Sequence, residues 1–156
     1  AGAGADAADA AVTRELAALA PRFGIGLQLV NVVKDAASDL EEGRCFVPRA
    51  LWPDERDRDG FARALVALCA RAHGFLDDAD RYVLTLPSTL EDARRFCALP
   101  LLLARRSLRA CERSTHLADP TRPVKVTREE VAEAFAWVAR HATDDDALHR
   151  RLTAER

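Results

Sequence analysis

The strongest constraint on the fold of this chain is a row of polar side chains within an apolar helical segment. Positions 28–40 read QLVNVVKDAASDL, where apolar residues recur at the three- and four-residue spacing of a helix. The polar residues recur at the same spacing and therefore share one helix face. They are Gln28, Asn31, Asp35, Ser38 and Asp39. Gly43 follows as a helix stop, so the sequence predicts one helix over residues 22–42.

Two carboxylates of this row form a candidate cation site. Asp35 and Asp39 lie one helical turn apart, which places their Cβ atoms roughly 5–6 Å from each other. Carboxylate and amide oxygens at that separation suit Mg²⁺, which shares its coordination shell with water and phosphate oxygens. Arg44, directly after the helix stop, has a planar guanidinium that can bind a phosphate through two hydrogen bonds. These residues predict binding of a metal-bridged anion.

Helical periodicity continues through the rest of the chain, and no stretch alternates convincingly in the manner of a strand. The expected class is all-α, a helical bundle of five or six helices. The predicted spans are 10–20, 22–42, 61–86, 90–111, a helix beginning at 127, and a short helix within 144–156. Pro21 is expected to end the first helix or to lie in the first turn of the second. The length suits a single domain over residues 1–156.

Proline and capping residues refine these boundaries. Pro100 lies inside the span 90–111 and is expected to kink that helix. Two pairs have the spacing of capping boxes, in which a hydroxyl and a carboxylate satisfy backbone amides at a helix start. The pairs are Ser88 with Glu91 and Thr127 with Glu130.

Composition excludes several other functions. The net charge of −2 and the pI near 6.1 provide no basic surface for nucleic acid. None of the four cysteines belongs to a C-x-x-C pair, which favours a reduced, cytoplasmic setting. A second acidic group, Asp77, Asp78 and Asp80, has Arg81 beside it and no amide or glycine around it. We expect that group to be a solvated face and not a metal site.

The segment from Asn31 to Pro48 resembles the second aspartate-rich motif of the squalene/phytoene synthase family. The family pattern is roughly N-x-x-[RK]-D-x-x-x-D-x-x-x-G-R-x-[YF]-x-P, usually preceded by a glutamine such as Gln28. Residues 96–100, FCALP, resemble an F-C-A-x-P segment of squalene synthases. Residues 124–128, VKVTR, resemble a V-K-[IL]-x-R segment near the end of the family domain.

The resemblance implies an isoprenoid-synthase fold and a Mg²⁺-dependent transferase that joins two prenyl diphosphates head to head. The substrate would be farnesyl or geranylgeranyl diphosphate, and the two short segments favour squalene-type over phytoene-type chemistry. Squalene-type members also use NADPH. The implied roles are metal binding and catalysis for Asn31, Asp35 and Asp39, substrate binding for Gln28, Lys34, Arg44, Phe46 and Phe96, and cofactor binding for Lys125 and Arg128.

The family's first aspartate-rich motif has no counterpart in residues 1–27, where Asp6 and Asp9 lie in an alanine run. We therefore expect the C-terminal half of a synthase domain, inactive alone. The other half would lie on the same gene or on a partner chain, and its absence would leave apolar helix faces exposed. We expect a cytoplasmic location, with the membrane surface as a further, peripheral partner.

Two other hypotheses stay open. The chain can be a family member that binds a prenyl diphosphate without catalysis, or an ordinary helical domain whose aspartate face is solvated. The purely structural hypothesis predicts that Gln28, Asn31, Asp35 and Asp39 face bulk water. Either hypothesis of diphosphate binding predicts that these side chains line a cavity.

Overall fold

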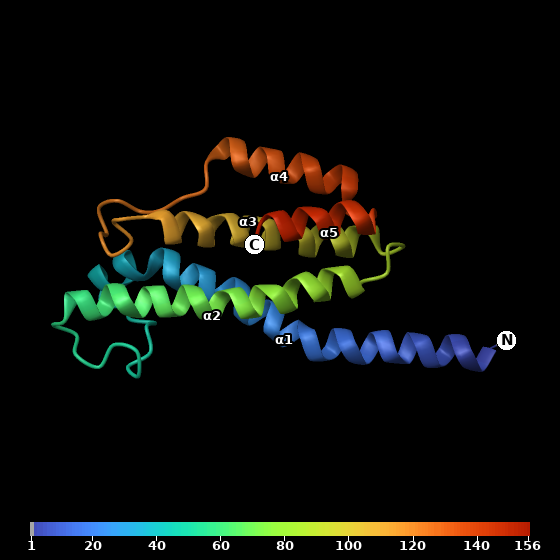
Figure 1. Cartoon of the computed structure of the whole chain (residues 1–156), viewed down its shortest axis with the longest axis horizontal. Helices are drawn as coiled ribbons and strands as arrows, with labels where there is room; N and C mark the ends of the chain where they lie inside the picture. The colour runs from blue at the N-terminus through green and yellow to red at the C-terminus, as the bar shows by residue number, and fades with distance from the viewer. Residues whose placement is uncertain (1) are drawn as a thin grey trace.

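Five helices make up the computed structural model, which describes residues 2–156 (Figure 1). They are α1 (Gly2–Glu41), α2 (Arg58–Thr85), α3 (Glu91–Arg113), α4 (Arg128–His141) and α5 (Asp145–Ala154). No strand occurs within that part of the chain, which confirms the all-α class. Helices α1, α2 and α3 pack against one another, while α4 packs on α3 and α5 on α2.

The core lies between α1, α2 and α3, where the predicted apolar stripes meet. Val33, Leu65 and Leu101 are fully buried there. Helices α1 and α2 approach closely at Gly26, where an added Cβ atom would lie 3.2 Å from the backbone carbon of Phe75. A side chain at position 26 would therefore push the two helices apart.

The prediction that Pro21 separates two helices is wrong. Helix α1 continues through Pro21, and Figure 1 shows its N-terminal part extending past the other helices. A proline removes one backbone hydrogen bond from a helix interior. Leu19 before it and Gly26 after it are both buried against the bundle, and this packing on both sides keeps the chain helical. Helix α3 likewise runs through Pro100.

One predicted capping box is confirmed and the other is wrong. Thr127 and Glu130 exchange the two expected hydrogen bonds, of 3.1 Å and 2.8 Å, at the start of α4. At α3 the N-cap is Leu90, without a side-chain hydrogen bond. The reason is a turn over residues 87–90, closed by the Leu90 amide on the Pro87 carbonyl at 2.9 Å, which starts the helix later than Ser88 requires.

The prediction that the second acidic group is a solvated face is wrong for Asp80. Its side chain is 1% exposed and accepts a hydrogen bond of 2.6 Å from Arg105, which is equally buried. Asp77 also pairs with Arg105, and Asp78 pairs with Arg22. Sequence spacing could not reveal this, because Arg105 reaches α2 from a different helix.

Membrane contact has only weak support. Within the described residues, the segment Ala7–Glu41 is long and apolar enough to cross a bilayer, judged by length and composition. A core helix of a soluble protein passes the same test, and this segment is part of α1, which packs on α2 and α3.

Candidate functional site

The predicted polar row lies on the side of α1 that faces away from the core. Val30, Val33 and Ala37 are buried on the opposite side of the helix. Gln28 and Asn31 are exposed, whereas the side chains of Asp35 and Asp39 are 47% and 16% exposed. The row is therefore open to solvent at Gln28 and Asn31 and largely covered at Asp39, so only its N-terminal part has the arrangement that the purely structural hypothesis predicts.

Each aspartate of the row forms an ion pair with a cation of the same motif. The Lys34 ammonium donates to both carboxylate oxygens of Asp35, at 2.8 Å and 2.9 Å. Arg44 donates to Oδ1 of Asp39 from Nη2 at 2.7 Å and from Nε at 3.2 Å. Arg44 also pairs with Glu42 at 2.5 Å. The hydrogen bonds to Asp39 and Glu42 raise the pKa of Arg44 above its ordinary value.

The backbone at the end of α1 positions Arg44. Gly43 has a φ of 76°, the left-handed conformation that favours glycine. The Arg44 amide donates to the Asp39 carbonyl at 2.7 Å, and the Gly43 amide donates to the Leu40 carbonyl at 3.0 Å. These two bonds form a Schellman motif. The motif folds Arg44 back over the last turn of the helix, beside the Asp39 carboxylate.

The row fits a hard cation in part. Asp35 and Asp39 offer carboxylate oxygens, and both hydrogen bonds from Arg44 go to Oδ1 of Asp39, so Oδ2 has a free coordination direction. Within the residues that the structure describes, no group of three or more His, Cys, Asp or Glu side chains could hold a metal ion. The row would thus provide two carboxylates of a coordination shell that other donors complete.

The structure does not bring Phe96 to the row. The charges of Lys34 and Asp35 act on the pKa of Cys111, so the row lies near the C-terminal end of α3. Phe96 lies 15 residues earlier in that helix, a separation of roughly 22 Å along its axis. Its side chain is 80% exposed and lines an apolar groove of about 220 Å³ between α3 and α4 with Leu99 and Phe135.

The other predicted substrate and cofactor residues are on the surface. Phe46, in the segment after α1, is 59% exposed. Lys125 lies in the connection before α4 and is exposed. Arg128 is the first residue of α4 and borders a shallow groove with Val131 and Phe135. Lys125 and Arg128 are therefore both accessible to a ligand.

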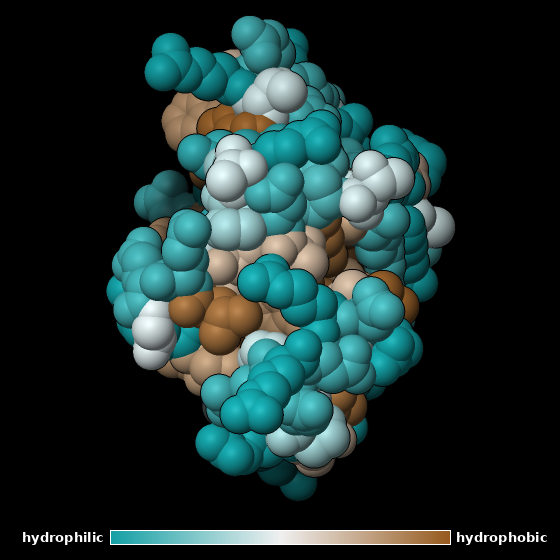
Figure 2. Space-filling model, turned by 90° about the vertical axis from the view of Figure 1, so that its left-hand side faces the viewer, coloured by the Kyte–Doolittle hydropathy of each residue, from teal (hydrophilic) through white to brown (hydrophobic). Residues whose placement is uncertain are grey.

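A larger groove, of about 810 Å³, lies between α2, α3 and residues 114–119. Figure 2 shows this end of the molecule, where hydrophobic surface lies among hydrophilic side chains. Burial raises the pKa of Cys69 to about 12 and that of Cys111 to about 11, so both thiols stay protonated. Neither cysteine is therefore an activated nucleophile. His73 and Glu112 form a pair of 2.7 Å in the lining.

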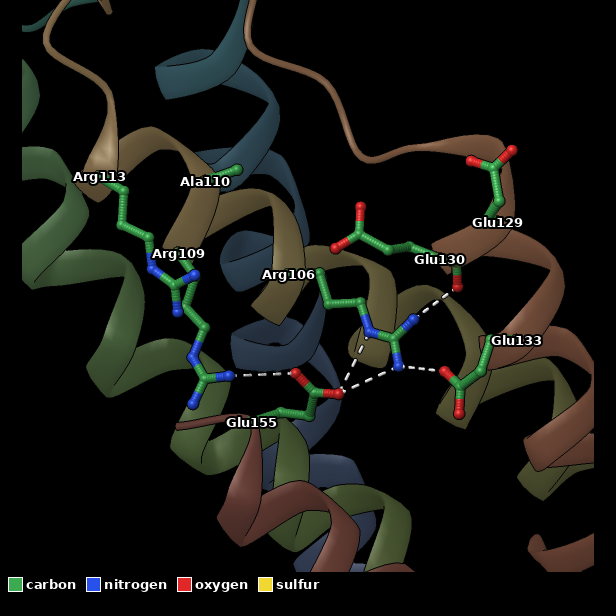
Figure 3. A pocket seen from close by; sticks show the side chains of 8 residues that line it. All are labelled: Arg106, Arg109, Ala110, Arg113, Glu129, Glu130, Glu133 and Glu155. Atoms are coloured by element: carbon green, nitrogen blue, oxygen red, sulfur yellow. Dashed lines mark hydrogen bonds and ion pairs between the residues drawn. The ribbon is translucent and has the colours of Figure 1, made fainter.

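Sequence reasoning missed an ionic network that joins α3, α4 and α5 (Figure 3). Arg106 donates to the Glu130 carbonyl at 2.5 Å, to Glu155 at 3.1 Å, and to the Glu133 carboxylate. Arg109 reaches Glu155 at 3.5 Å. These partners lie 24 to 49 residues apart, beyond any spacing rule. The pocket in Figure 3 is therefore crossed by ion pairs of the chain itself.

Comparison with known proteins adds the decisive observation. The sequence profile described as squalene/phytoene synthase matches residues 4–130. The chain belongs to the squalene/phytoene synthase family. The matched range includes the whole segment from Gln28 to Pro48 and the residues 96–100. No curated protein sequence matches the chain.

Membership in the squalene/phytoene synthase family agrees with the fold. A solved structure titled "The complex structure of TcSQS with ligand, BPH1237" superimposes with a TM-score of 0.66 and 25% sequence identity. The match covers 87% of this chain and 43% of that chain. The chain thus spans less than half the length of this solved relative, within the same all-α fold.

Proposed function

We propose that this chain carries one of the two aspartate-rich diphosphate sites of a Mg²⁺-dependent prenyltransferase that joins prenyl diphosphates head to head. The observation that carries the proposal is the pairing of two carboxylates on one face of α1 with Lys34 and with Arg44, just after the helix, inside the family match. Asp35 and Asp39 would hold Mg²⁺, with Asn31 and Gln28 as polar neighbours. Lys34 and Arg44 would bind the diphosphate oxygens.

This assignment suits the chemistry of a prenyl diphosphate. The bond between the allylic carbon and the diphosphate oxygen breaks, and the diphosphate leaves with the electron pair. Bound Mg²⁺ would stabilise that departing charge. Lys34 and Arg44 would neutralise the remaining phosphate charge, and apolar walls closed over the site by another segment would keep water from the carbocation.

A complementary segment would complete the site. Phe96, Phe135 and Val131 are exposed on α3 and α4, as expected of faces that another segment covers. We propose that this segment supplies the first aspartate-rich motif and closes a cavity over the row on α1. In a squalene-type enzyme, Lys125 and Arg128 would contact NADPH. A cytoplasmic location with peripheral membrane contact through α1 is part of the proposal.

The partial exposure of the row favours a second candidate, binding of a prenyl diphosphate without catalysis. Two carboxylates, without a third His, Cys, Asp or Glu ligand among the described residues, are sufficient for a weak metal-bridged site. The two candidates differ in turnover: adding a segment that contains the first aspartate-rich motif would restore product formation only if the chain is half of an enzyme.

The first experiment is binding of a non-hydrolysable farnesyl diphosphate analogue, measured by calorimetry with and without Mg²⁺. We expect Mg²⁺-dependent binding that is lost in Asp35→Ala/Asp39→Ala. Asp92→Ala is the control, because Asp92 is a fully exposed carboxylate on α3. Circular dichroism confirms that each variant is folded. Undiminished binding in the double variant would contradict the assignment of the row.

A further inference from the structure

We propose that Lys34 and Arg44 are exchangeable counterions that occupy Asp35 and Asp39 until a diphosphate takes them over. The inference rests on the proposed function of the row. Its consequence is that Mg²⁺ and diphosphate bind this chain weakly when offered separately and strongly when offered together.

The Lys34 contact is the first observation. Adjacent residues on a helix do not face each other, so the Lys34 side chain must fold sideways to reach Asp35. It nevertheless places its ammonium on both carboxylate oxygens, at 2.8 Å and 2.9 Å. Lys34 forms no other hydrogen bond within the part of the chain that the structure describes. Among the described residues, the Lys34 ammonium therefore pairs with Asp35.

The Arg44 contact is the second observation. The Schellman motif at Gly43 holds the Arg44 backbone against the Asp39 carbonyl, so this cation is placed by the main chain. Its guanidinium divides between two carboxylates: Nε and Nη2 donate to the same oxygen of Asp39, and Nη1 pairs with Glu42. Arg44 is half exposed, and a phosphate approaching from solvent could accept from the same donors.

The electrostatic consequence is a coupling between the two ligands. A Mg²⁺ ion arriving alone meets carboxylates whose charge is already countered, and it must lose water to replace those cations. A diphosphate arriving alone meets cations that carboxylates already hold. When both bind, Mg²⁺ takes the carboxylates and the diphosphate takes Lys34 and Arg44, so Asp35, Asp39, Lys34 and Arg44 each keep a partner of opposite charge. Each ligand must then raise the affinity for the other by the same factor.

The test is calorimetry on the full chain with MgCl₂ alone, with inorganic pyrophosphate alone, and with pyrophosphate in the presence of Mg²⁺. The variants are Lys34→Gln and Arg44→Gln. Arg49→Gln is the matched control, since Arg49 is 85% exposed and pairs with Glu55, outside the row. An exposed ion pair contributes little, so we expect each variant to tighten binding of Mg²⁺ alone by about two- to fivefold. The same variants should weaken pyrophosphate binding in Mg²⁺, and the control should change neither.

The outcomes separate this inference from the proposed function. If the variants weaken pyrophosphate binding but leave the affinity for Mg²⁺ alone unchanged, the cations are diphosphate ligands only and the exchange is wrong. If the wild-type chain binds no pyrophosphate even with Mg²⁺, both proposals are wrong. The Nε–H resonance of Arg44 provides a structural readout: it should shift with Mg²⁺ and pyrophosphate together much more than with either alone.

Discussion

Arg105 and Asp80 form an ion pair of 2.6 Å in which each side chain is only 1% exposed. The pair joins α3 to α2 in the interior of the bundle. Burial raises the pKa of Asp80, although the nearby charge and hydrogen bond of Arg105 oppose the rise. This pair is buried on both sides, in contrast to the partly exposed pairs of Asp35 with Lys34 and of Asp39 with Arg44.

Replacement of Arg105 by methionine should destabilise the protein by up to about 3–5 kcal/mol, because the buried Asp80 carboxylate would keep only the bond of 3.1 Å from the half-exposed Arg156. The measurement is urea unfolding at neutral pH. The double variant Arg105→Met/Asp80→Leu should recover most of the loss, since both charges are then absent. A double variant as unstable as the single one would show that packing volume, and not charge, explains the effect.

The burial of Asp80 in this pair predicts that the free energy of unfolding depends on pH. A carboxyl whose pKa is raised on folding contributes stability below its unfolded pKa, and this contribution is lost as pH rises through the folded value. The Asp80 pKa is raised, so Asp80→Asn should reduce the loss of stability on going from acid to neutral pH. A pH series of unfolding free energies measures this. An unchanged slope would contradict the buried state of Asp80.

Titration of Glu133 should change stability with pH in the opposite direction to titration of Asp80. The hydrogen bond from Arg106 is the main cause that lowers the pKa of Glu133. Its contribution is thus present above its unfolded pKa and is lost as pH falls through the lower folded value. We expect Glu133→Gln to flatten the acid side of the stability curve and to increase amide hydrogen exchange in α4. Glu129→Gln, a neighbour without an ion pair within the described residues, is the control.

Two glycines on α1 form a matched pair for helix packing. A Cβ atom at Gly26 would lie 3.2 Å from the backbone of Phe75, whereas one at Gly24 would meet nothing within 4 Å. Gly24→Ala should stabilise by up to about 1 kcal/mol through helix propensity. Gly26→Ala should be less stable than Gly24→Ala by about 1–3 kcal/mol, the usual cost of overpacking. Equal thermal midpoints would argue against the close approach of α1 and α2.

Gly43 connects the fold with the proposed site. With φ at 76° and open space around it, Gly43→Ala should cost roughly 1–2 kcal/mol from backbone conformation alone. The variant should also weaken Mg²⁺-pyrophosphate binding, because the turn places Arg44. Gly43→Asn should be milder in both measurements, since asparagine tolerates this conformation better. If Gly43→Ala is destabilised but binds Mg²⁺-pyrophosphate with an unchanged constant, the turn does not position Arg44 for binding.

Residue spacing and capping residues predicted the helices and the motif, because the interactions that form them join residues close in the sequence. Periodicity placed the polar row of α1 on a single face, Gly43 ended the helix, and Thr127 with Glu130 began α4. The spacing from Asn31 to Pro48 was sufficient to indicate the family that the profile match then confirmed. Each of these features depends on residues within a few turns of one another.

Only the tertiary structure decided the features that depend on distant partners. Packing on both sides carried α1 through Pro21, and Arg105 turned Asp80 from a presumed surface residue into a buried one. Arg94 joins the ends of α2 and α4 to the start of α5 by bonds to Leu86, Ala142 and Asp145. A long arginine side chain can reach a partner on another helix, and no regular spacing in the sequence marks that partner. Charge spacing along one helix therefore does not predict these ion pairs. The sequence by itself determined which residues share a helix face; the packing of helices decided which charges are buried and which remain open to a ligand.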